Sequence, residues 1–220
     1  MLSVENITVK ISAYTILRAL TIEVPTASIV ALVGRNGAGK TTTMRTIMGL
    51  VSMTEGKIRL DNHDLRPIPP HDRAKLGIGY LPEDRRLISG LTVEENLMIP
   101  AQAGGLLAGE SRLKTIYGLL PEVKAVAGRK AMELSGGQQK MVALGRSFVN
   151  AKRLLLLDEP FEGVSMALCR KLAEVIHEFQ KAEQELSVLV AESDLKRAGM
   201  LSDKTYVIER GEVVEANSIG

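Results

Sequence analysis

The sequence predicts an α/β fold in which helices cover a mainly parallel sheet. Short aliphatic runs, at residues 29–33, 76–81, 154–157 and 187–191, have the length and composition of strands that are covered on both faces. The segment 168–179 repeats apolar residues every three or four positions, which is the spacing of a helix packed on a core. Strands that alternate with helices pair in parallel, because each helix returns the chain to the same edge of the sheet.

Both ends of the chain predict an antiparallel β portion beside that sheet. Apolar residues alternate along residues 2–9 and recur at residues 22–24, directly before a proline. Near the other end, residues 204–208 and 212–214 are joined by a short Arg-Gly turn and predict a hairpin.

The middle of the chain predicts an inserted helical subdomain. We place it at about residues 85–145, between two parts of the core at about residues 1–84 and 146–220, so that the chain forms a single domain. Thr92 is followed three residues later by Glu95, a pairing typical of the first turn of a helix.

Further helices are expected within this subdomain. Residues 113–120 and 122–126 have helical patterns, and residues 139–149 follow a Ser-Gly-Gly sequence with a similar pattern. Residues 102–111 are rich in glycine and alanine and predict a loop.

Composition narrows the class of protein. The chain has 220 residues, of which 45% are hydrophobic and 25% charged, which is ordinary for a domain that buries a core. A formal net charge of +2 is too small to indicate nucleic acid as the main partner. The chain has no uninterrupted apolar run of the roughly 18 residues that span a bilayer, and no export signal is recognised. The single cysteine, Cys169, is expected to be a packing residue, and its lack of a partner fits a reducing cytoplasm.

The most informative stretch is a glycine-rich loop between the run at residues 29–33 and a helical segment. It consists of Gly34, Arg35, Asn36, Gly37, Ala38, Gly39, Lys40 and Thr41, with Thr42 directly after it. Glycines let backbone N–H groups approach phosphate oxygens, and the following helix presents its positive end to them. Lys40 supplies a charge for the terminal phosphates, and the Thr41 hydroxyl is placed for Mg²⁺. An ordinary glycine-rich turn is the alternative, which the flanking strand and helix disfavour.

Two carboxylates, Asp158 and Glu159, follow the run at residues 154–157. Ligands of open α/β sheets bind beyond the carboxyl ends of the strands, so these carboxylates and the phosphate loop are expected to meet. Asp158 suits Mg²⁺ beside a nucleotide, and Glu159 suits a general base that accepts a proton from an attacking water. Without the phosphate loop, the pair would fit a solvated acidic strand end equally well.

A second anion-binding corner is predicted at Ser135, Gly136, Gly137 and Gln138, because they precede a helical run. The chain thus has two such corners but one carboxylate pair. One explanation is that the second corner serves the γ-phosphate bound to a partner chain. An ordinary glycine-rich helix entry is the alternative for this stretch taken alone.

Together, the phosphate loop, residues 134–138 and residues 154–159 resemble the Walker A, signature and Walker B motifs of the ATP-binding subunits of ABC transporters. The resemblance covers nearly the whole chain. It implies a RecA-like P-loop NTPase core with an inserted helical subdomain. It also implies a head-to-tail dimer in which each ATP lies between the Walker A motif of one chain and the signature of the other.

The stretch around Glu83 and the serine at position 193 resemble those of the ATPases of branched-chain amino acid importers. That group also handles urea, short amides and aromatic acids. Glu83 lies where most relatives have a glutamine near Mg²⁺ or the attacking water, and Ser193 replaces a histidine that contacts the γ-phosphate. Ser165 lies where many relatives have an aspartate that contacts the opposite site. Tyr14 falls where the family stacks an aromatic ring on adenine, with a half-buried surface tyrosine as the alternative.

The resemblance implies ATP hydrolysis coupled to solute import, with ATP and Mg²⁺ as cofactors and with Glu159, Lys40 and Ser193 as the catalytic residues. The implied partners are transmembrane permease subunits, a second identical or related ATPase subunit and, indirectly, a periplasmic solute-binding protein. The implied location is the cytoplasmic face of the inner membrane. An ABC-type ATPase that acts on soluble partners is one alternative, although such relatives usually carry long coiled coils or two fused cassettes. A weakly hydrolysing ATP-sensing subunit is another, because Ser193 cannot carry a charge.

Overall fold

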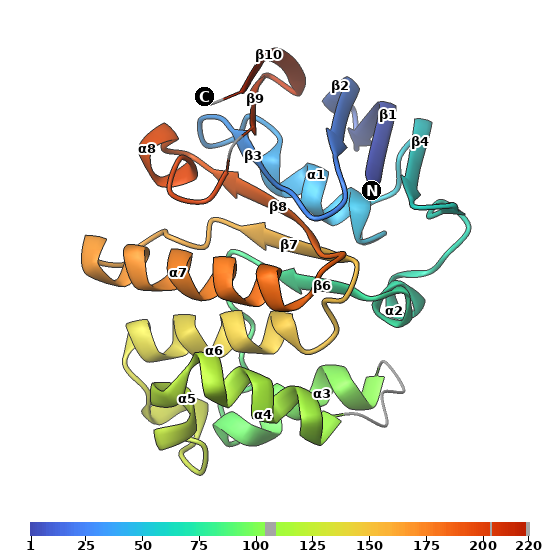
Figure 1. Ribbon diagram of the computed structural model, residues 1–220. Coiled ribbons are helices and arrows are strands. Elements are labelled where there is room, and N and C mark those ends of the chain that lie inside the picture. The colour runs from blue at the N-terminus through green and yellow to red at the C-terminus, as the bar shows by residue number, and fades with distance from the viewer. Residues whose placement is uncertain (104–108, 203, 219–220) are drawn as a thin grey trace.

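A six-stranded sheet forms the centre of the computed structural model, which describes residues 1–103, 109–202 and 204–218. The strand order is β10-β9-β3-β8-β7-β6, in which β10 is antiparallel to β9 and all other pairs are parallel (Figure 1). The strands are β3 (Ile29–Val33), β6 (Ile78–Leu81), β7 (Leu154–Asp158), β8 (Ser187–Glu192), β9 (Lys204–Glu209) and β10 (Glu212–Ser218). The predicted α/β fold with a mainly parallel sheet is confirmed.

A smaller antiparallel sheet lies beside the first, with the order β2-β1-β4-β5. Its strands are β1 (Leu2–Ile11), β2 (Tyr14–Val24), β4 (Glu55–Leu60) and β5 (His63–Asp64). The helix α1 (Lys40–Ile47) lies between the two sheets and contacts β2 on one side and β7 and β8 on the other (Figure 1). Met44 and Ile47 are fully buried there, so the helix that follows the phosphate loop is held by both sheets.

Helices cover the other face of the central sheet. The rings of Phe148 on α6 (Gly136–Phe148) and Phe179 on α7 (Met166–Ala182) stack with their centroids 4.0 Å apart. Three helices pack beyond α6, namely α3 (Val93–Ala103), α4 (Gly109–Leu119) and α5 (Pro121–Ala125) (Figure 1). The short elements are α2 (Pro70–Arg73), α8 (Leu195–Ala198) and two 3₁₀ turns at Ala74–Leu76 and Ala131–Glu133. The exact limits of the helical subdomain, at about residues 85 and 145, stay a prediction.

The helix start at Thr92 is confirmed. The Thr92 hydroxyl accepts a hydrogen bond from the backbone N–H of Glu95 at 3.2 Å, and the backbone N–H of Thr92 donates to the Glu95 carboxylate at 2.7 Å. The two side chains thus satisfy two backbone donors that the first helical turn leaves free.

Two sequence-based boundaries are wrong. Of the loop predicted at residues 102–111, the first two residues end α3 and the last three begin α4, while residues 104–108 lie outside the described residues. Ala101 in the last turn of α3 and Arg112 in the first turn of α4 are buried, and such packing stabilises helices whose composition alone favours a loop. The strand predicted from residue 76 begins at Ile78, because Gly77 has a φ of 82° and interrupts the extended chain.

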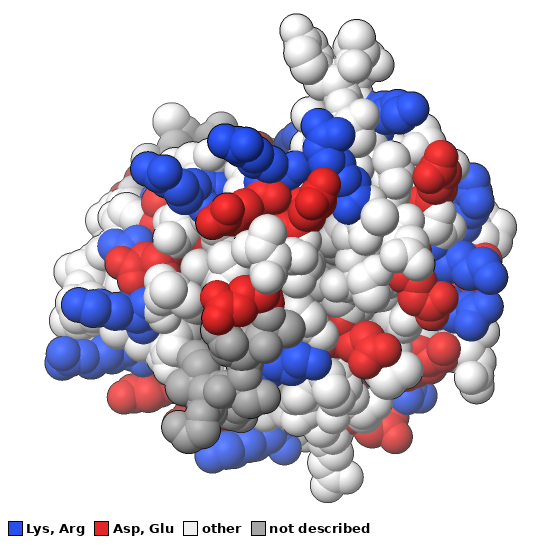
Figure 2. Space-filling view, turned by 90° about the horizontal axis from the view of Figure 1, so that it is seen from above, with Lys and Arg blue, Asp and Glu red and all other residues white. Residues whose placement is uncertain are grey.

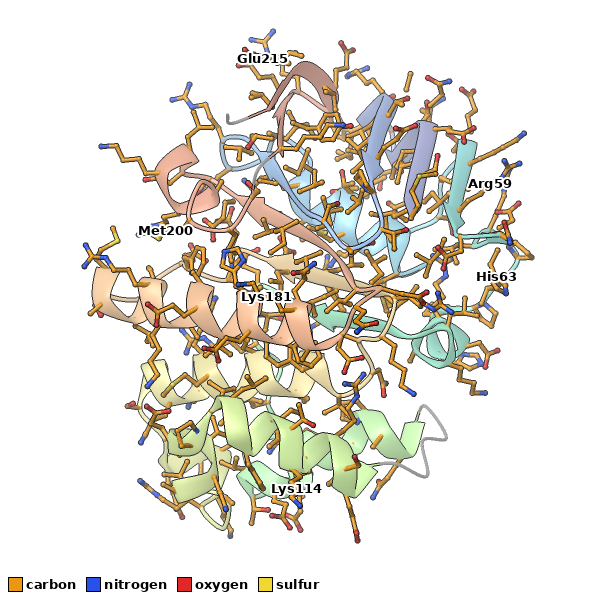
Figure 3. All side chains as sticks on the ribbon, in the orientation of Figure 1. Arg59, His63, Lys114, Lys181, Met200 and Glu215 are labelled. Atoms are coloured by element: carbon orange, nitrogen blue, oxygen red, sulfur yellow. The ribbon has the colours of Figure 1, made fainter. Side chains whose placement is uncertain are left out.

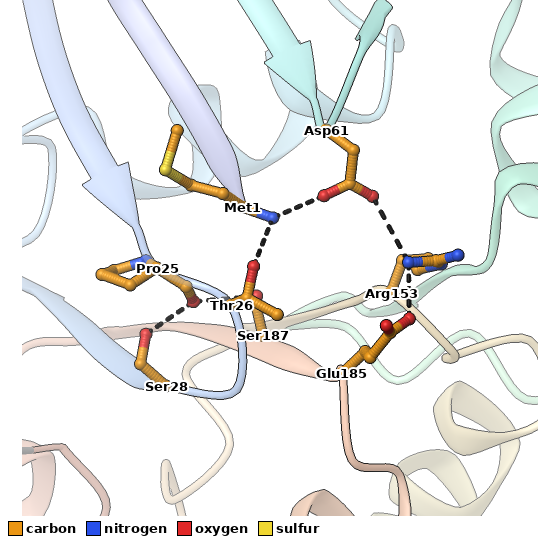
Figure 4. Close-up of polar contacts among 8 residues, drawn as sticks. All are labelled: Met1, Pro25, Thr26, Ser28, Asp61, Arg153, Glu185 and Ser187. Carbon is orange, nitrogen blue, oxygen red and sulfur yellow. Dashed lines mark hydrogen bonds and ion pairs between the residues drawn. The ribbon is translucent and has the colours of Figure 1, made fainter.

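A polar network joins the antiparallel sheet to the amino ends of the parallel strands, at the edge opposite the phosphate loop (Figure 4). The amino group of Met1 donates to Asp61 at 2.6 Å and to Thr26 at 3.0 Å. Arg153 lies 3.9 Å from Asp61 and 2.6 Å from Glu185. Because these groups are partly exposed, each pair adds little stability, but together they fix the relative position of the sheets at this edge.

The outer surface carries charges of both signs. Seen from above, lysine and arginine side chains are interspersed with aspartate and glutamate side chains (Figure 2). Arg59 on β4 and His63 on the edge strand β5 are exposed at the periphery (Figure 3). No helix among the described residues has the length and apolar character needed to cross a membrane.

Arg73 is buried beneath the end of α1. Its guanidinium donates to the carbonyls of Thr46 and Ile47 in the last turn of α1, and to those of Leu65 at 2.6 Å and Ile68 at 2.9 Å. A cation at the carboxyl end of a helix also interacts favourably with the helix dipole. Arg73 therefore fastens the far end of the helix that begins at the phosphate loop.

We expect Arg73→Met to lower the free energy of unfolding by about 2–4 kcal/mol, because four buried carbonyls lose a charged donor at once. Urea unfolding followed by circular dichroism measures this, since the chain contains no tryptophan. The exposed Arg59→Met on β4 is the matched control and should change stability by less than about 0.5 kcal/mol. Equal losses in the two variants would contradict this role of Arg73.

Candidate functional site

The phosphate loop connects β3 to α1, and its backbone requires glycine. Gly37 and Gly39 have φ values of 81° and 117°, in the left-handed region that other residues disfavour. A Cβ atom on Gly34 would lie 2.3 Å from the carbonyl oxygen of Ile208, whereas one on Gly37 would meet nothing within 4 Å. The loop is therefore packed against the sheet on one side and open on the other, where a ligand can approach.

The first turn of α1 can bind an anion. No side chain caps its N-terminus, and the turn contains no acidic residue, so its backbone N–H groups remain available. The positive end of the helix dipole points the same way.

Lys40 is folded back onto the loop. Its ammonium donates to the carbonyl of Gly34 at 2.6 Å and to that of Arg35 at 3.3 Å. The same nitrogen lies 3.0 Å from Oε1 of Glu159, and both side chains are almost completely buried. The three donors of the ammonium are thus all used within the chain.

Glu159 lies immediately beyond β7 in a constrained conformation. Its φ of 50° is in the left-handed region, and its backbone N–H donates to the carbonyl of Ala191 at 3.0 Å. The backbone N–H and the hydroxyl of Ser193 each lie 3.3 Å from Oε2 and donate to it. Lys40 and Ser193, both predicted as catalytic, therefore hold the two oxygens of the Glu159 carboxylate.

Asp158 ends β7 and presents one unused oxygen. Oδ1 accepts from the Thr41 hydroxyl at 3.1 Å, whereas Oδ2 is buried without a hydrogen-bond partner in the described part of the chain. Burial raises the pKa of Asp158 to about 6, and the nearby Glu83 and Glu159 carboxylates act in the same direction. A buried oxygen without a donor, next to a hydroxyl, fits a hard cation such as Mg²⁺.

Half of the predicted site residues line two adjoining hollows. The first is lined by Ile16, Asn36, Gly37, Gly39, Lys40, Thr41, Thr42, Glu83, Glu159 and Glu162. The second is lined by Thr41, Arg45, Tyr80, Pro82, Glu83, Asp84, Asp158 and Glu162. The described residues contain no cluster of three His, Cys, Asp or Glu side chains suited to a metal. A Mg²⁺ ion here would therefore use few protein ligands and complete its shell with phosphate and water oxygens, as is usual for this ion.

The signature residues and Tyr14 stand apart from these hollows. Ser135 and Gln138 form the first turn of α6, where each side chain bonds the backbone of the other, and Ser135 and Gly136 are exposed. Tyr14 begins β2 with 75% of its surface exposed, so the structure does not place it in the hollows.

Sequence reasoning missed several residues at the site. Ile16, Arg45 and Glu162 line the hollows, and Glu162 could have been noticed because it is a third carboxylate only three residues after Glu159. Lys140 and Glu192 are buried next to this turn. No local pattern indicates Lys140, which comes to the site only through packing.

Glu192, at the end of β8, is a buried carboxyl group. One of its oxygens accepts from the backbone N–H of Phe161 at 3.0 Å, and the other is buried without a donor among the residues described. Burial raises the pKa of Glu192 to about 8, and the neighbouring Glu159 carboxylate acts in the same direction. Glu192 therefore holds its proton to a higher pH than an exposed glutamate does.

A family model described as ABC transporter matches residues 17–162 of this chain. The chain belongs to the ABC transporter family. Within that family it is an ATP-hydrolysing cassette, so the ATPase expected from the sequence is confirmed.

Relatives of this ABC cassette serve different solutes. A probable branched-chain amino acid transport ATP-binding protein of Archaeoglobus fulgidus is 36% identical over 189 residues, which are 84% of this chain and 78% of that protein. A lipopolysaccharide export system ATP-binding protein of Haemophilus influenzae is 30% identical over 216 residues, 97% of this chain and 89% of that protein. The resemblance to the amino acid importer ATPases is confirmed, but it does not distinguish importer from exporter.

Solved ABC cassettes have the same fold. The structure of an ATP-binding subunit of an ABC transporter superposes with a TM-score of 0.87 at 27% identity, covering 100% of this chain and 90% of that one. A dimeric bacterial ABC transporter cassette gives the same TM-score at 24% identity, covering 100% and 99% of the two chains. The antiparallel β portion and the helices beyond α6 are thus features of the shared fold.

We expect Glu192→Gln to remove a pH dependence of stability. The folded pKa of Glu192 lies above its unfolded value, so its contribution is fully present below about pH 4.3 and is lost as the pH rises through about 8. Between pH 5 and 8.5 the free energy of unfolding of the variant should fall less than that of the parent. Urea unfolding at pH 5, 7 and 8.5 measures both curves, and parallel curves would show that Glu192 ionises as freely as in the unfolded chain.

Proposed function

We propose that this chain is the ATP-hydrolysing subunit of an importer for branched-chain amino acids or for related small amides or aromatic acids. The observation that carries the hydrolytic part is the convergence of Lys40, Thr41, Asp158 and Glu159 on one open site. The importer part rests on the 36% identical relative, whose name specifies branched-chain amino acid transport.

The phosphate loop would hold the nucleotide. The phosphates would be bound by backbone N–H groups from Gly34 to Thr42 and by the amino end of α1. Arg35, Asn36 and Ala38 would contribute through the backbone. Tyr14 would stack on adenine from its exposed position on β2.

Thr41 and Asp158 would hold Mg²⁺, with Glu83 beside them. Their hydroxyl and carboxylate oxygens suit this ion, and Oδ2 of Asp158 has no other donor in the structure as described. Bound Mg²⁺ would neutralise the negative charge that the phosphates bring into a site already lined by carboxylates.

Glu159 would act as the general base. In the free chain its carboxylate is occupied by Lys40 on one oxygen and Ser193 on the other. Lys40 would move from Glu159 to the terminal phosphates when nucleotide binds, because the phosphates offer it more negative charge. Oε1 of Glu159 is then free to accept a proton from water, while Ser193 keeps the other oxygen in place.

A second chain would complete the site. Ser135, Gly136, Gly137 and Gln138 begin α6 outside both hollows, with their first residues exposed, so they are accessible to another molecule. In a head-to-tail pair they would face the γ-phosphate on the partner, and a solved cassette of the same fold is dimeric. The partner ATPase would be identical or related.

The pair would attach to transmembrane permease subunits on the cytoplasmic face of the inner membrane. A periplasmic binding protein would deliver the solute to those subunits. ATP would favour the closed pair and hydrolysis the open one, and the difference in affinity between the states would drive the permease.

Glu159→Gln should still bind ATP but hydrolyse it about 10²–10⁴-fold more slowly, because an amide cannot accept the proton. It should also accumulate as a dimer with Mg·ATP, which size-exclusion chromatography detects. Glu178→Gln, at an exposed position on α7, is the control and should keep the parent rate. Turnover by Glu159→Gln at the parent rate would assign the base elsewhere.

Purification of the tagged chain from detergent-solubilised host membranes should recover permease-like chains. In a separate experiment, deletion of its gene should abolish the uptake of radiolabelled leucine or a related solute by the host. The parent gene should restore uptake, whereas Lys40→Ala should not. Retained uptake together with a defect in lipopolysaccharide export would favour the function of the Haemophilus influenzae relative instead. Recovery of soluble partners only would point to a different class of ABC ATPase.

A further inference from the structure

Lys140 is a lysine in an unusual environment. It lies on α6, only 1% of its surface is exposed, and no carboxylate of the described residues forms an ion pair with it. Burial lowers the pKa of its ammonium, and the nearby Arg85 acts in the same direction, partly offset by Glu192, Glu162 and Glu159. A methionine or leucine would fill this space without the cost of burying a charge.

Among the residues that the structure describes, the ammonium of Lys140 has one hydrogen-bond acceptor, the backbone carbonyl of Glu159, to which it donates at 2.7 Å. The same carbonyl also accepts from the backbone N–H of Glu162 at 3.2 Å. Lys140 therefore binds the backbone of the residue whose carboxylate faces the hollow, and it does so from a different helix.

The backbone of Glu159 needs such support. Its φ of 50° is unfavourable for a residue with a side chain, so the surrounding contacts must hold it there. In a short turn the direction of the carbonyl and the direction of the side chain are fixed by the same backbone dihedral angles. A donor that holds the carbonyl thereby also fixes the direction in which the side chain leaves the backbone, and Lys40 and Ser193 hold the carboxylate at its end.

We propose that Lys140 is a positioning residue for ATP hydrolysis, which holds the Glu159 carbonyl so that the carboxylate points at the nucleotide hollow. The proposal rests on the proposed role of Glu159 as the base. Lys140 lines neither hollow, so it does not touch the nucleotide and acts only through Glu159.

The size of the effect follows from the other contacts of this turn. The N–H of Glu159 donates to Ala191, and the N–H of Phe161 donates to Glu192, so the turn keeps its place in the fold without Lys140, while the Glu159 carbonyl loses its charged donor and can rotate. Loss of the ammonium should therefore loosen the carboxylate and leave the fold intact.

The test uses Lys140→Met in the full chain, since methionine has a similar length and no donor. We expect kcat for ATP hydrolysis to fall about tenfold, the effect of losing one charged hydrogen bond, while the Kd for a non-hydrolysable ATP analogue changes less than about twofold. Lys114→Met is the matched control, because Lys114 is exposed on α4 (Figure 3), and it should keep the parent values. Urea unfolding of both variants verifies that they are folded.

A double-mutant cycle distinguishes positioning from a general structural effect. In the Glu159→Gln background, where no base remains to be aimed, Lys140→Met should not slow the residual single-turnover rate further. An equal slowing in both backgrounds would show that Lys140 acts otherwise than through Glu159 and would overturn the proposal, as would a parent kcat in Lys140→Met. If Lys140→Met does not fold, Lys140→Gln takes its place in both experiments. If Glu159→Gln alone retains the parent rate, the assignment of the base is what fails.

Discussion

The site depends on the buried ion pair between Lys40 and Glu159. Two charges removed from water are stable only when their other hydrogen-bonding positions are filled, and here they are. Two loop carbonyls take the remaining donors of Lys40, and Ser193 supplies two donors to the second oxygen of Glu159. The pair joins the phosphate loop to the end of β7, so the loop and the carboxylates form one unit before any nucleotide arrives.

Strand order makes that pair possible. In the register of the parallel sheet, Val33 of β3 lies beside Glu192 of β8, and Ala191 of β8 lies beside Asp158 of β7. The chain therefore leaves β3 as the phosphate loop and leaves β7 as Glu159 at the same edge, with only β8 between them. The antiparallel sheet and Arg73 secure α1 from the other side, so the loop cannot move away from the carboxylates without disturbing the core.

How much of this could be predicted from the sequence depends on how local each feature is. The Gly-Lys-Thr loop and the Asp-Glu pair each follow directly after a recognisable strand. Because the carboxyl ends of parallel strands lie at the same edge of a sheet, the sequence predicts that they meet there. Lys140 and Glu192 could not be assigned that way, because their roles arise from contacts with Glu159 and Phe161 across different elements. The helical residues at both ends of segment 102–111 were not predicted for a similar reason, because the burial of Ala101 and Arg112 outweighs the local composition.

The charges around the site explain why it suits a nucleotide with a cation. The acidic residues that line the hollows are Glu83, Asp84, Asp158, Glu159 and Glu162, with Lys40 and Arg45 as the basic side chains among the described lining residues. Without a cation, burial and mutual repulsion raise the pKa of Asp158 to about 6. A divalent ion at Asp158 would reverse that repulsion, and the phosphates would draw Lys40 away from Glu159. The cation lowers the repulsion between the carboxylates and the phosphates, and the phosphates bring further oxygen ligands to the cation. The site should therefore bind the cation and the nucleotide together more strongly than it binds either alone.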